Sequence, residues 1–174
     1  AKKIVEEKTL NSMINGINST STMLPFSTNS LDRIIALESA QHFKPFHDFI
    51  SESYRVLKKN GILTFAMPVI KNTSSIKKLG VLALTWSSEH YKQDFVVSKT
   101  TKKFKIIKKI EIGHDVFEPL SDYYIKNRRR LRNNILTQYP SYVENLLFKS
   151  LLKMKKTSHE KLIDYLLIKC IKVN

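Results

Sequence analysis

The chain has 174 residues, the length of one globular domain with one hydrophobic core, and 42% of them are hydrophobic. With only four glycines the composition excludes a disordered or fibrous chain, and the single cysteine, Cys170, excludes a disulfide framework. The formal net charge is +15, but the cations are spread along the whole chain, so charge alone assigns no partner.

No apolar run approaches the roughly 20 residues that a membrane-spanning helix needs, and no signal peptide is recognisable. Cys170 stands in an apolar, strand-like run, so we expect a buried and inert thiol. We therefore expect a cytoplasmic protein, and no residue pattern predicts a metal site.

The first thirty residues carry weak structural signals. Residues 1–10 are expected to end a helix, and residues 13–18 to form a short strand. Residues 19–23 then form a polar loop before Leu24-Pro25-Phe26, and residues 27–30 are a cluster of turn formers.

The strongest pattern begins just after that turn. Ile34 to Leu37 form a continuous apolar run, which is typical of a parallel strand covered on both faces. A polar tip, Glu38 to Phe43, follows at the carboxyl end of this strand, where ligands bind in open α/β sheets. The sequence therefore predicts a binding site at this tip.

An amphipathic helix is predicted next, with Pro45 in its first turn and Lys58 and Lys59 in its last turn. Its end is predicted at Asn60-Gly61, because glycine adopts the left-handed conformation without steric cost. A strand from Ile62 to Ile70, with Pro68 near its end, completes a right-handed βαβ unit. The apolar face of the helix is formed by Phe46, Phe49, Ile50, Tyr54 and Leu57.

The remaining elements are predicted more coarsely. Residues 71–80 read as a loop, 81–98 as a helix, 104–112 as a strand, 118–160 as mostly helical and 162–173 as a last strand. The helical stretch is expected to break at Tyr139-Pro140. No repeat or linker is visible, so we expect one domain, 1–174, with residues 118–160 as a helical cap before the last strand.

Two clusters of cations lie beside aromatic residues, a combination that can bind RNA or acidic lipid. The alternative is that the first cluster is a solvated strand edge and the second a solvated helix face, with no ligand. We favour this alternative for both clusters. The clusters are Lys99, Lys102, Lys103, Lys105, Lys108 and Lys109, and Lys126, Arg128, Arg129, Arg130 and Arg132.

The run from Leu24 to Ala66 resembles the second half of class I S-adenosylmethionine-dependent methyltransferases of the type 11, small-molecule branch. Its residues Leu-Pro-Phe, Ala-Leu-Glu-Ser, His42-Phe43 and Tyr54-Arg-Val-Leu-Lys carry the likeness, and residues 86–91 and 112–119 look similar to the same branch. The resemblance implies an α/β, Rossmann-like sheet of which this chain supplies the later strands, and S-adenosylmethionine as the cofactor.

The family's glycine-rich cofactor turn has no counterpart in this chain. The four glycines, Gly16, Gly61, Gly80 and Gly113, stand far apart, whereas close approach of backbone to the cofactor needs a cluster. We therefore expect an N-terminally truncated methyltransferase that is inactive by itself, and either the missing N-terminal half or a second copy as its partner.

The resemblance also assigns site residues. Thr20 occupies the position of an Asp that contacts adenine in the family, with Ser21 beside it, and Leu37 and Glu38 would face the methionine end of the cofactor. Some sugar O-methyltransferases of this type use a His–Asp pair as base, at the positions of Gln41 and Met67 here, so that pair is not inherited.

His42 remains as the candidate catalytic base, because histidine transfers protons near neutral pH. Gln41 and Met67 are expected beside the acceptor, together with Trp86, His90 and Tyr91; core packing is the alternative for the last three.

The acceptor is expected to be a small molecule, methylated on oxygen, nitrogen or carbon. A non-catalytic basic module that binds RNA or protein stays open, and so does a fragment of an RNA methyltransferase. The tip Glu-Ser-Ala-Gln-His-Phe disfavours the latter, because such enzymes often carry an Asn/Asp-Pro-Pro-Tyr-like motif there to grip a flipped-out base.

Overall fold

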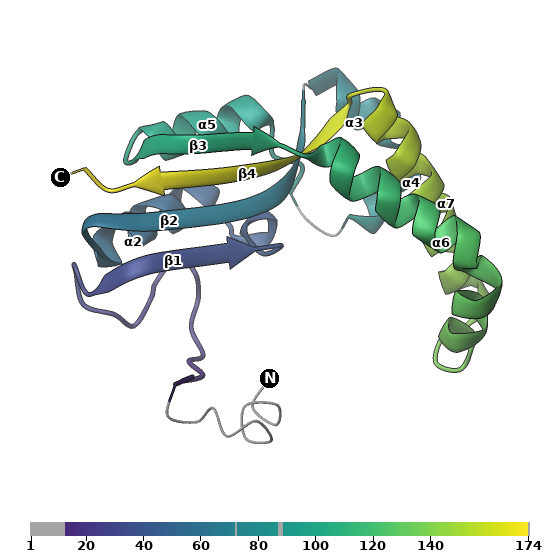
Figure 1. Cartoon of the computed structure of the whole chain (residues 1–174), viewed down its shortest axis with the longest axis horizontal. Helices are drawn as coiled ribbons and strands as arrows, with labels where there is room; N and C mark the ends of the chain where they lie inside the picture. Colours follow the sequence, from purple (N-terminus) through teal and green to yellow (C-terminus); the bar gives the residue numbers. More distant parts are fainter. Residues whose placement is uncertain (1–12, 72, 87–88, 174) are drawn as a thin grey trace.

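A computed structural model describes residues 13–71, 73–86 and 89–173 of the chain. The helix expected over residues 1–10 lies outside these ranges. Four strands form one mixed sheet in the order β1 (Leu31–Leu37), β2 (Leu57–Ile70), β4 (Ile163–Ile171), β3 (Lys105–Glu111) (Figure 1). β1 and β2 are parallel, and β4 runs antiparallel to both of its neighbours. The predicted mixed α/β architecture is confirmed.

The βαβ unit forms as predicted, with different boundaries. Helix α2 (Phe46–Val56) begins after Pro45 and ends at Val56, before the lysines that were expected in its last turn. Asn60, with φ of 63°, and not Gly61 takes the left-handed conformation. Gly61 is needed for another reason: a Cβ there would lie 2.7 Å from the Lys58 carbonyl oxygen.

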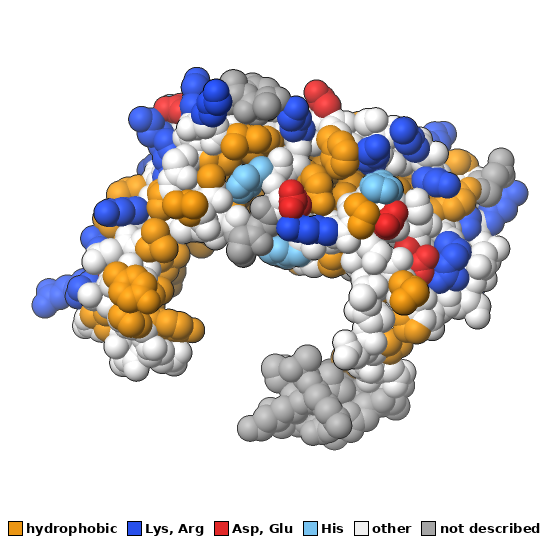
Figure 2. Space-filling view, turned by 180° about the vertical axis from the view of Figure 1, so that it is seen from behind, with side chains coloured by type: hydrophobic (Ala, Val, Ile, Leu, Met, Phe, Trp, Pro, Cys, Tyr) orange, Lys and Arg blue, Asp and Glu red, His pale blue; other side chains and the backbone are white. Residues whose placement is uncertain are grey.

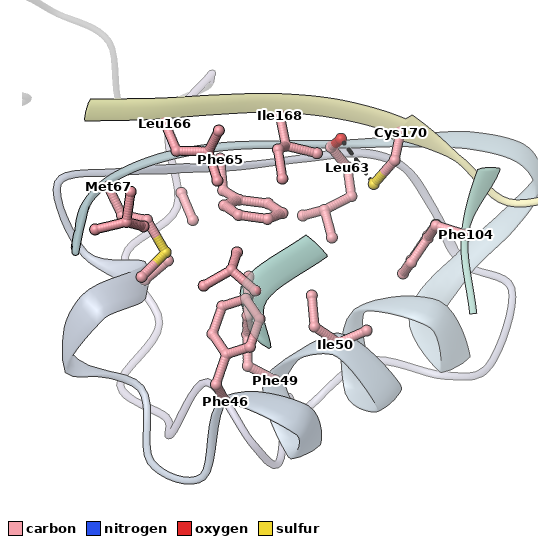
Figure 3. Packing of buried hydrophobic residues seen from close by; sticks show 14 of the residues in the cluster. Phe46, Phe49, Ile50, Leu63, Phe65, Met67, Phe104, Leu166, Ile168 and Cys170 are labelled. Carbon is pink, nitrogen blue, oxygen red and sulfur yellow. Dashed lines mark hydrogen bonds between the residues drawn. The ribbon is translucent and has the colours of Figure 1, made fainter. Parts of the chain in front are cut away.

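One face of the sheet is covered by α2 and α5 (Gln93–Thr101) (Figure 1). The core between these layers is aromatic, with the Phe46 ring 5.8 Å from the Phe65 ring and Phe49 also packed on Phe65 (Figure 3). Cys170 closes one end of this core, and burial raises the pKa of its thiol to about 12. The expected buried, inert thiol is confirmed.

A second, smaller core lies at the end of the sheet where β1 and β2 finish. It joins the sheet to α3 (Thr73–Leu79), α4 (Val81–Thr85) and the long pair α6 (Gly113–Leu136) and α7 (Ser141–His159). α6 and α7 pack against each other and extend away from the sheet as a helical hairpin (Figure 1). The predicted helical segment before the last strand is therefore present, and its break falls at residues 137–140.

The other face of β1 is bare of described helices (Figure 1). Ile35 is 76% exposed and Leu37 67%, so the prediction of a strand covered on both faces is wrong. Residues 13–18 form no strand beside β1, which leaves β1 as an edge. An apolar run shows that a strand is able to bury both faces. Whether both faces are buried depends on the neighbouring elements, which a short sequence pattern does not reveal.

Two other boundaries differ from the prediction. Residues 73–79 are the helix α3 and not a loop, and the helix expected over 81–98 is split into α4 and α5 by non-helical residues that include Trp86, His90 and Tyr91. In the described ranges no helix has the length and apolar character needed to cross a membrane.

The hairpin is joined to the sheet where β3 meets α6. Gly113 is buried against β4, and its N–H donates to Asp164 Oδ1 over 2.8 Å. A Cβ on Gly113 would lie 2.9 Å from the backbone nitrogen of Tyr165. Lys71 links the carboxylates of Asp164, at 2.8 Å, and Glu111. This junction fixes the direction in which α6 leaves the sheet.

Candidate active site

The chain turns sharply at Glu38, directly after β1. Glu38 has φ of 51°, a conformation that is uncommon for a residue other than glycine and that costs of order 1–3 kcal/mol. The turn is fixed by its backbone N–H, which donates to the Ala66 carbonyl oxygen of β2 over 3.1 Å. The Glu38 side chain is thereby held at the carboxyl end of two parallel strands, the edge at which open α/β sheets bind ligands.

Residues from two other elements contact the Glu38 carboxylate. Gln41, in the short 3-10 helix η1 (Ala40–His42), donates from Nε2 to Glu38 Oε2 over 3.4 Å. Tyr165 of β4 is buried, and its hydroxyl lies close enough to the Glu38 carboxylate for that charge to act on it. Burial first, and the carboxylate second, raise the pKa of Tyr165 above its usual range, so it remains a neutral donor.

Gln41 has an acceptor atom that the described residues leave without a partner. Its side chain is only 5% exposed, yet its Oε1 receives no hydrogen bond. An unsatisfied buried acceptor costs about 1–3 kcal/mol, and a ligand that donates a hydrogen bond would recover this energy. Glu38 and Gln41 together therefore present acceptor atoms suited to a ligand that carries N–H, ammonium or hydroxyl groups.

His42 lies one residue beyond Gln41 and is exposed. Its backbone N–H donates to the Ser39 carbonyl oxygen over 2.9 Å, which closes the 3-10 turn. Among the described residues no hydrogen bond or ion pair engages its ring, so the imidazole is accessible at the same edge as Glu38. The structure thus brings Leu37, Glu38, Gln41 and His42 together in one turn.

Thr20 and Ser21 belong to a separate turn. Thr20 is bridged to Met23, and its Oγ1 lies 3.3 Å from Thr22 Oγ1. Within the described ranges, no hydrogen bond joins this turn to Glu38, Gln41 or His42. The chain that follows it is fixed through α2, since Glu52 accepts from the Leu24 N–H.

The four remaining predicted site residues lie in the two cores. Met67 is fully buried against Leu166 on the α2 side of the sheet (Figure 3). Tyr91 stacks on Phe95, and its hydroxyl donates to the Phe43 carbonyl oxygen over 3.1 Å. On the other face, the Trp86 ring lies 6.2 Å from His90 and 5.8 Å from Phe117. His90 Nδ1 is buried without a partner in the described part of the chain. Their contact with a substrate stays a prediction.

Tyr165 was missed from the sequence, although it completes the cluster. It is separated from Glu38 by more than a hundred residues, so no local pattern joins them. One signal in the sequence could have indicated it: Tyr165 is a tyrosine within the apolar run of the last strand. A buried tyrosine hydroxyl usually has a hydrogen-bond partner, so a polar residue was to be expected near it.

Known proteins resemble this chain in sequence and in fold. Residues 1–65 match the family model described as methyltransferase domain. Erythromycin 3''-O-methyltransferase of Saccharopolyspora erythraea is 45% identical over 42 residues, which are 24% of this chain and 14% of that enzyme.

Solved structures match almost the whole chain. A putative sarcosine dimethylglycine methyltransferase from Galdieria sulphuraria superposes with a TM-score of 0.82 at 13% identity, over 98% of this chain and 64% of that one. The chain has the class I methyltransferase fold. A geranyl diphosphate C-methyltransferase from Streptomyces coelicolor A3(2), complexed with S-adenosyl-L-homocysteine, gives a TM-score of 0.75 at 11% identity, over 97% and 57% of the two chains.

The [4+2]-cyclase SpnF also superposes, with a TM-score of 0.75 at 17% identity over 99% of this chain and 60% of that one. The chain thus spans about three fifths of the length of these solved structures. The resemblance stated from the sequence is confirmed at the level of the fold. The individual site residues have no test in these comparisons.

Proposed function

We propose that this chain is the later part of an S-adenosylmethionine-dependent methyltransferase that acts on a small molecule. The observation that carries the proposal is the Glu38–Gln41–Tyr165 cluster, because its acceptor atoms stand at the ligand-binding edge of a methyltransferase sheet. The family match and the superposed methyltransferases support the same reaction.

In this proposal Leu37 and Glu38 lie toward the methionine end of the cofactor, and Thr20 and Ser21 toward its adenine end. The positive charge of an ammonium group would complement the Glu38 carboxylate. Gln41 and His42 then lie toward the acceptor. In this proposal Met67 and Tyr91 border it from the α2 side of the sheet, and Trp86 and His90 border it from the other face.

For methyl transfer, this chain needs to do little more than align the reacting groups. A sulfonium is a good leaving group, so holding the acceptor atom, the methyl group and sulfur in line supplies much of the rate acceleration. His42 accepts a proton only where the acceptor must lose one, which fits its exposed position beside Gln41. The helical hairpin, including the cap proposed over residues 118–160, closes the acceptor side.

The cofactor site needs more polypeptide than this chain supplies. Its four glycines lie far apart, and the one that follows a described strand at the edge where Glu38 lies, Gly113 after β3, is packed against Asp164 and Tyr165 of β4. We place the whole protein in the cytoplasm, consistent with the buried thiol of Cys170.

Calorimetric titration with S-adenosylmethionine tests the proposal. The 174-residue chain should bind weakly or not at all, and a protein extended upstream through a glycine-rich first strand should bind. In the extended protein, Glu38→Gln should weaken binding about tenfold and Tyr165→Phe less, in the same direction. Asp32→Asn is the matched control, since Asp32 is an exposed acid at the opposite end of β1.

Micromolar binding by the 174-residue chain alone would show that the cofactor site lies elsewhere. Unchanged binding in Glu38→Gln would remove the Glu38 cluster from the site.

The net charge of +15 favours a second candidate, a basic module that binds RNA. The structure weakens it for the second cation cluster, because Arg128 and Arg132 are paired with Glu144. A steep loss of RNA affinity with rising salt would favour this candidate over the methyltransferase.

A further inference from the structure

A groove between α4 and α7 lies outside the cluster around Glu38. It encloses about 280 Å³ and is lined by Leu82 and Trp86 from the α4 side and by a stripe of α7. That stripe runs from Val143 to Met154, about 16 Å along the helix axis. The size is close to the lower limit of about 300 Å³ for ligand pockets.

The groove offers an apolar surface. Its two hydroxyl groups are both occupied within their own helices: Thr85 donates to the Val81 carbonyl oxygen over 3.1 Å, and Ser150 donates to that of Leu146 over 2.8 Å. Leu146 and Leu147 are 42% and 38% exposed, although burial of a leucine stabilises a fold by roughly 1.5–3 kcal/mol. A hydrocarbon chain would cover these side chains without breaking the hydrogen bond of either hydroxyl group.

A cationic hollow of about 460 Å³ lies farther along α7, where α3 and the last turns of α7 meet. Lys153 and Met154 are consecutive, and they line the hollow and the groove respectively. Four lysines surround the hollow with one glutamate: Lys77, Lys78, Lys153, Lys156 and Glu160. Apolar and cationic side chains accordingly gather together over the part of the molecule that carries the hairpin (Figure 2).

We propose that the groove and the hollow together bind an anionic amphiphile, with its hydrocarbon chain along α7 and its acidic head among the lysines. The charge of the hollow selects the head group, and the length and apolar lining of the groove select a single chain. The proposal concerns binding alone; the groove shares Trp86 with the acceptor site proposed above, and the test uses no cofactor.

Trp86 provides a direct measurement, because it is the single tryptophan of the chain and forms one wall of the groove. Dodecyl phosphate, added below its micelle threshold and without cofactor, should shift Trp86 fluorescence to shorter wavelength in a saturable way. Dodecyl maltoside has the same chain and a neutral head, and it should bind at least about tenfold more weakly. Inorganic phosphate alone should give no shift.

Matched variants separate the groove from the rest of the surface. Leu147→Asp should weaken dodecyl phosphate at least about tenfold, whereas Leu152→Asp, on the same helix but outside the groove, should leave it unchanged. Lys153→Glu should weaken dodecyl phosphate and not dodecyl maltoside, with Lys149→Glu as its control. Circular dichroism of each variant confirms that the helices are retained.

Several results would overturn the proposal. Equal affinity for both head groups would remove the role of the lysines, and equal losses in Leu147→Asp and Leu152→Asp would remove the groove. A response only to vesicles of anionic lipid would identify a membrane surface in its place. A dimer in sedimentation that Leu147→Asp dissociates would show that a second copy covers the groove.

Discussion

Glu111 is the residue whose charge state matters most for the junction between the sheet and the hairpin. Its hydrogen bond from Lys71, with further bonds from Lys109 and Gln93, lowers the pKa of the carboxyl from 4.5 to about 2. The folded state therefore holds Glu111 ionised at pH values where the unfolded chain protonates it. The stabilisation is complete above pH 4.5 and is lost as the pH falls from 4.5 toward 2.

We predict that Glu111→Gln flattens the acid limb of the stability curve. The thermal midpoint of the wild type should fall steeply between pH 4.5 and 2, and that of the variant less steeply. Thermal scans by circular dichroism across this range measure the difference, with Glu160→Gln as an exposed control. Parallel curves for wild type and Glu111→Gln would contradict the role of the Lys71 contact.

Gly113 is a second residue on which the junction depends. We predict that Gly113→Ala destabilises the fold by about 1–3 kcal/mol, the usual range for overpacking, because the new Cβ would meet Asp164 and Tyr165 at under 3 Å. Denaturant unfolding measures this change. Gly16→Ala is the control, since nothing lies within 4 Å of a Cβ at that position, and a similar loss in both variants would count against the explanation.

At the scale of elements, the hairpin contains its own buried ionic network. Glu144 has a fully buried side chain that accepts hydrogen bonds from Tyr124 at 3.0 Å and Arg128 at 2.8 Å, and it forms a longer contact with Arg132. Arg128 also lies 3.6 Å from the centre of the Phe148 ring. Arg128 therefore joins α6 to α7, and Lys126, Arg129 and Arg130 are the members of its cluster without a contact to Glu144.

This division predicts opposite outcomes for neighbouring arginines. Arg128→Ala should lower the thermal midpoint, because it leaves a buried carboxylate less compensated, whereas Arg129→Ala with Arg130→Ala should not. If the acceptor is a small molecule, the Arg129/Arg130 double variant should also retain methyl transfer in the whole enzyme. Loss of activity in that double variant with unchanged stability would favour a phosphate-rich substrate.

The sequence predicted those elements whose signal is local. All four strands were found as apolar runs, and α2 was found from its apolar face and Pro45. The missed features depend on distant residues: β1 has an exposed face because nothing described packs there, and Tyr165 reaches Glu38 only across the sheet. The tip Leu37 to His42 was predicted because its residues are adjacent in sequence. The residues of β2 and β4 that contact this tip could not be predicted, because they are distant in sequence.

For the whole molecule, the edge strand β1 is the surface at which we expect association. It presents Ile35 beside an unpaired edge, a combination that promotes contact between sheets. We predict that the isolated chain oligomerises and that Ile35→Lys raises the monomer fraction in sedimentation. Ile107→Lys, at a 47% exposed isoleucine on the opposite edge strand, is the control. A monodisperse wild-type monomer would contradict this expectation.

The strand order also determines when each strand can pair during translation. β3 is made before β4, yet its pairing partner in the described sheet is β4, and β2 likewise needs β4 on its second side. Until residue 171 has left the ribosome, β2 and β3 both present unpaired backbone to the cell, while the hairpin of α6 and α7 can already form from local contacts. A nascent chain halted before residue 163 would therefore lack β4 and leave β3 without a partner, and it would be a substrate for chaperones at the moment when its helices are complete.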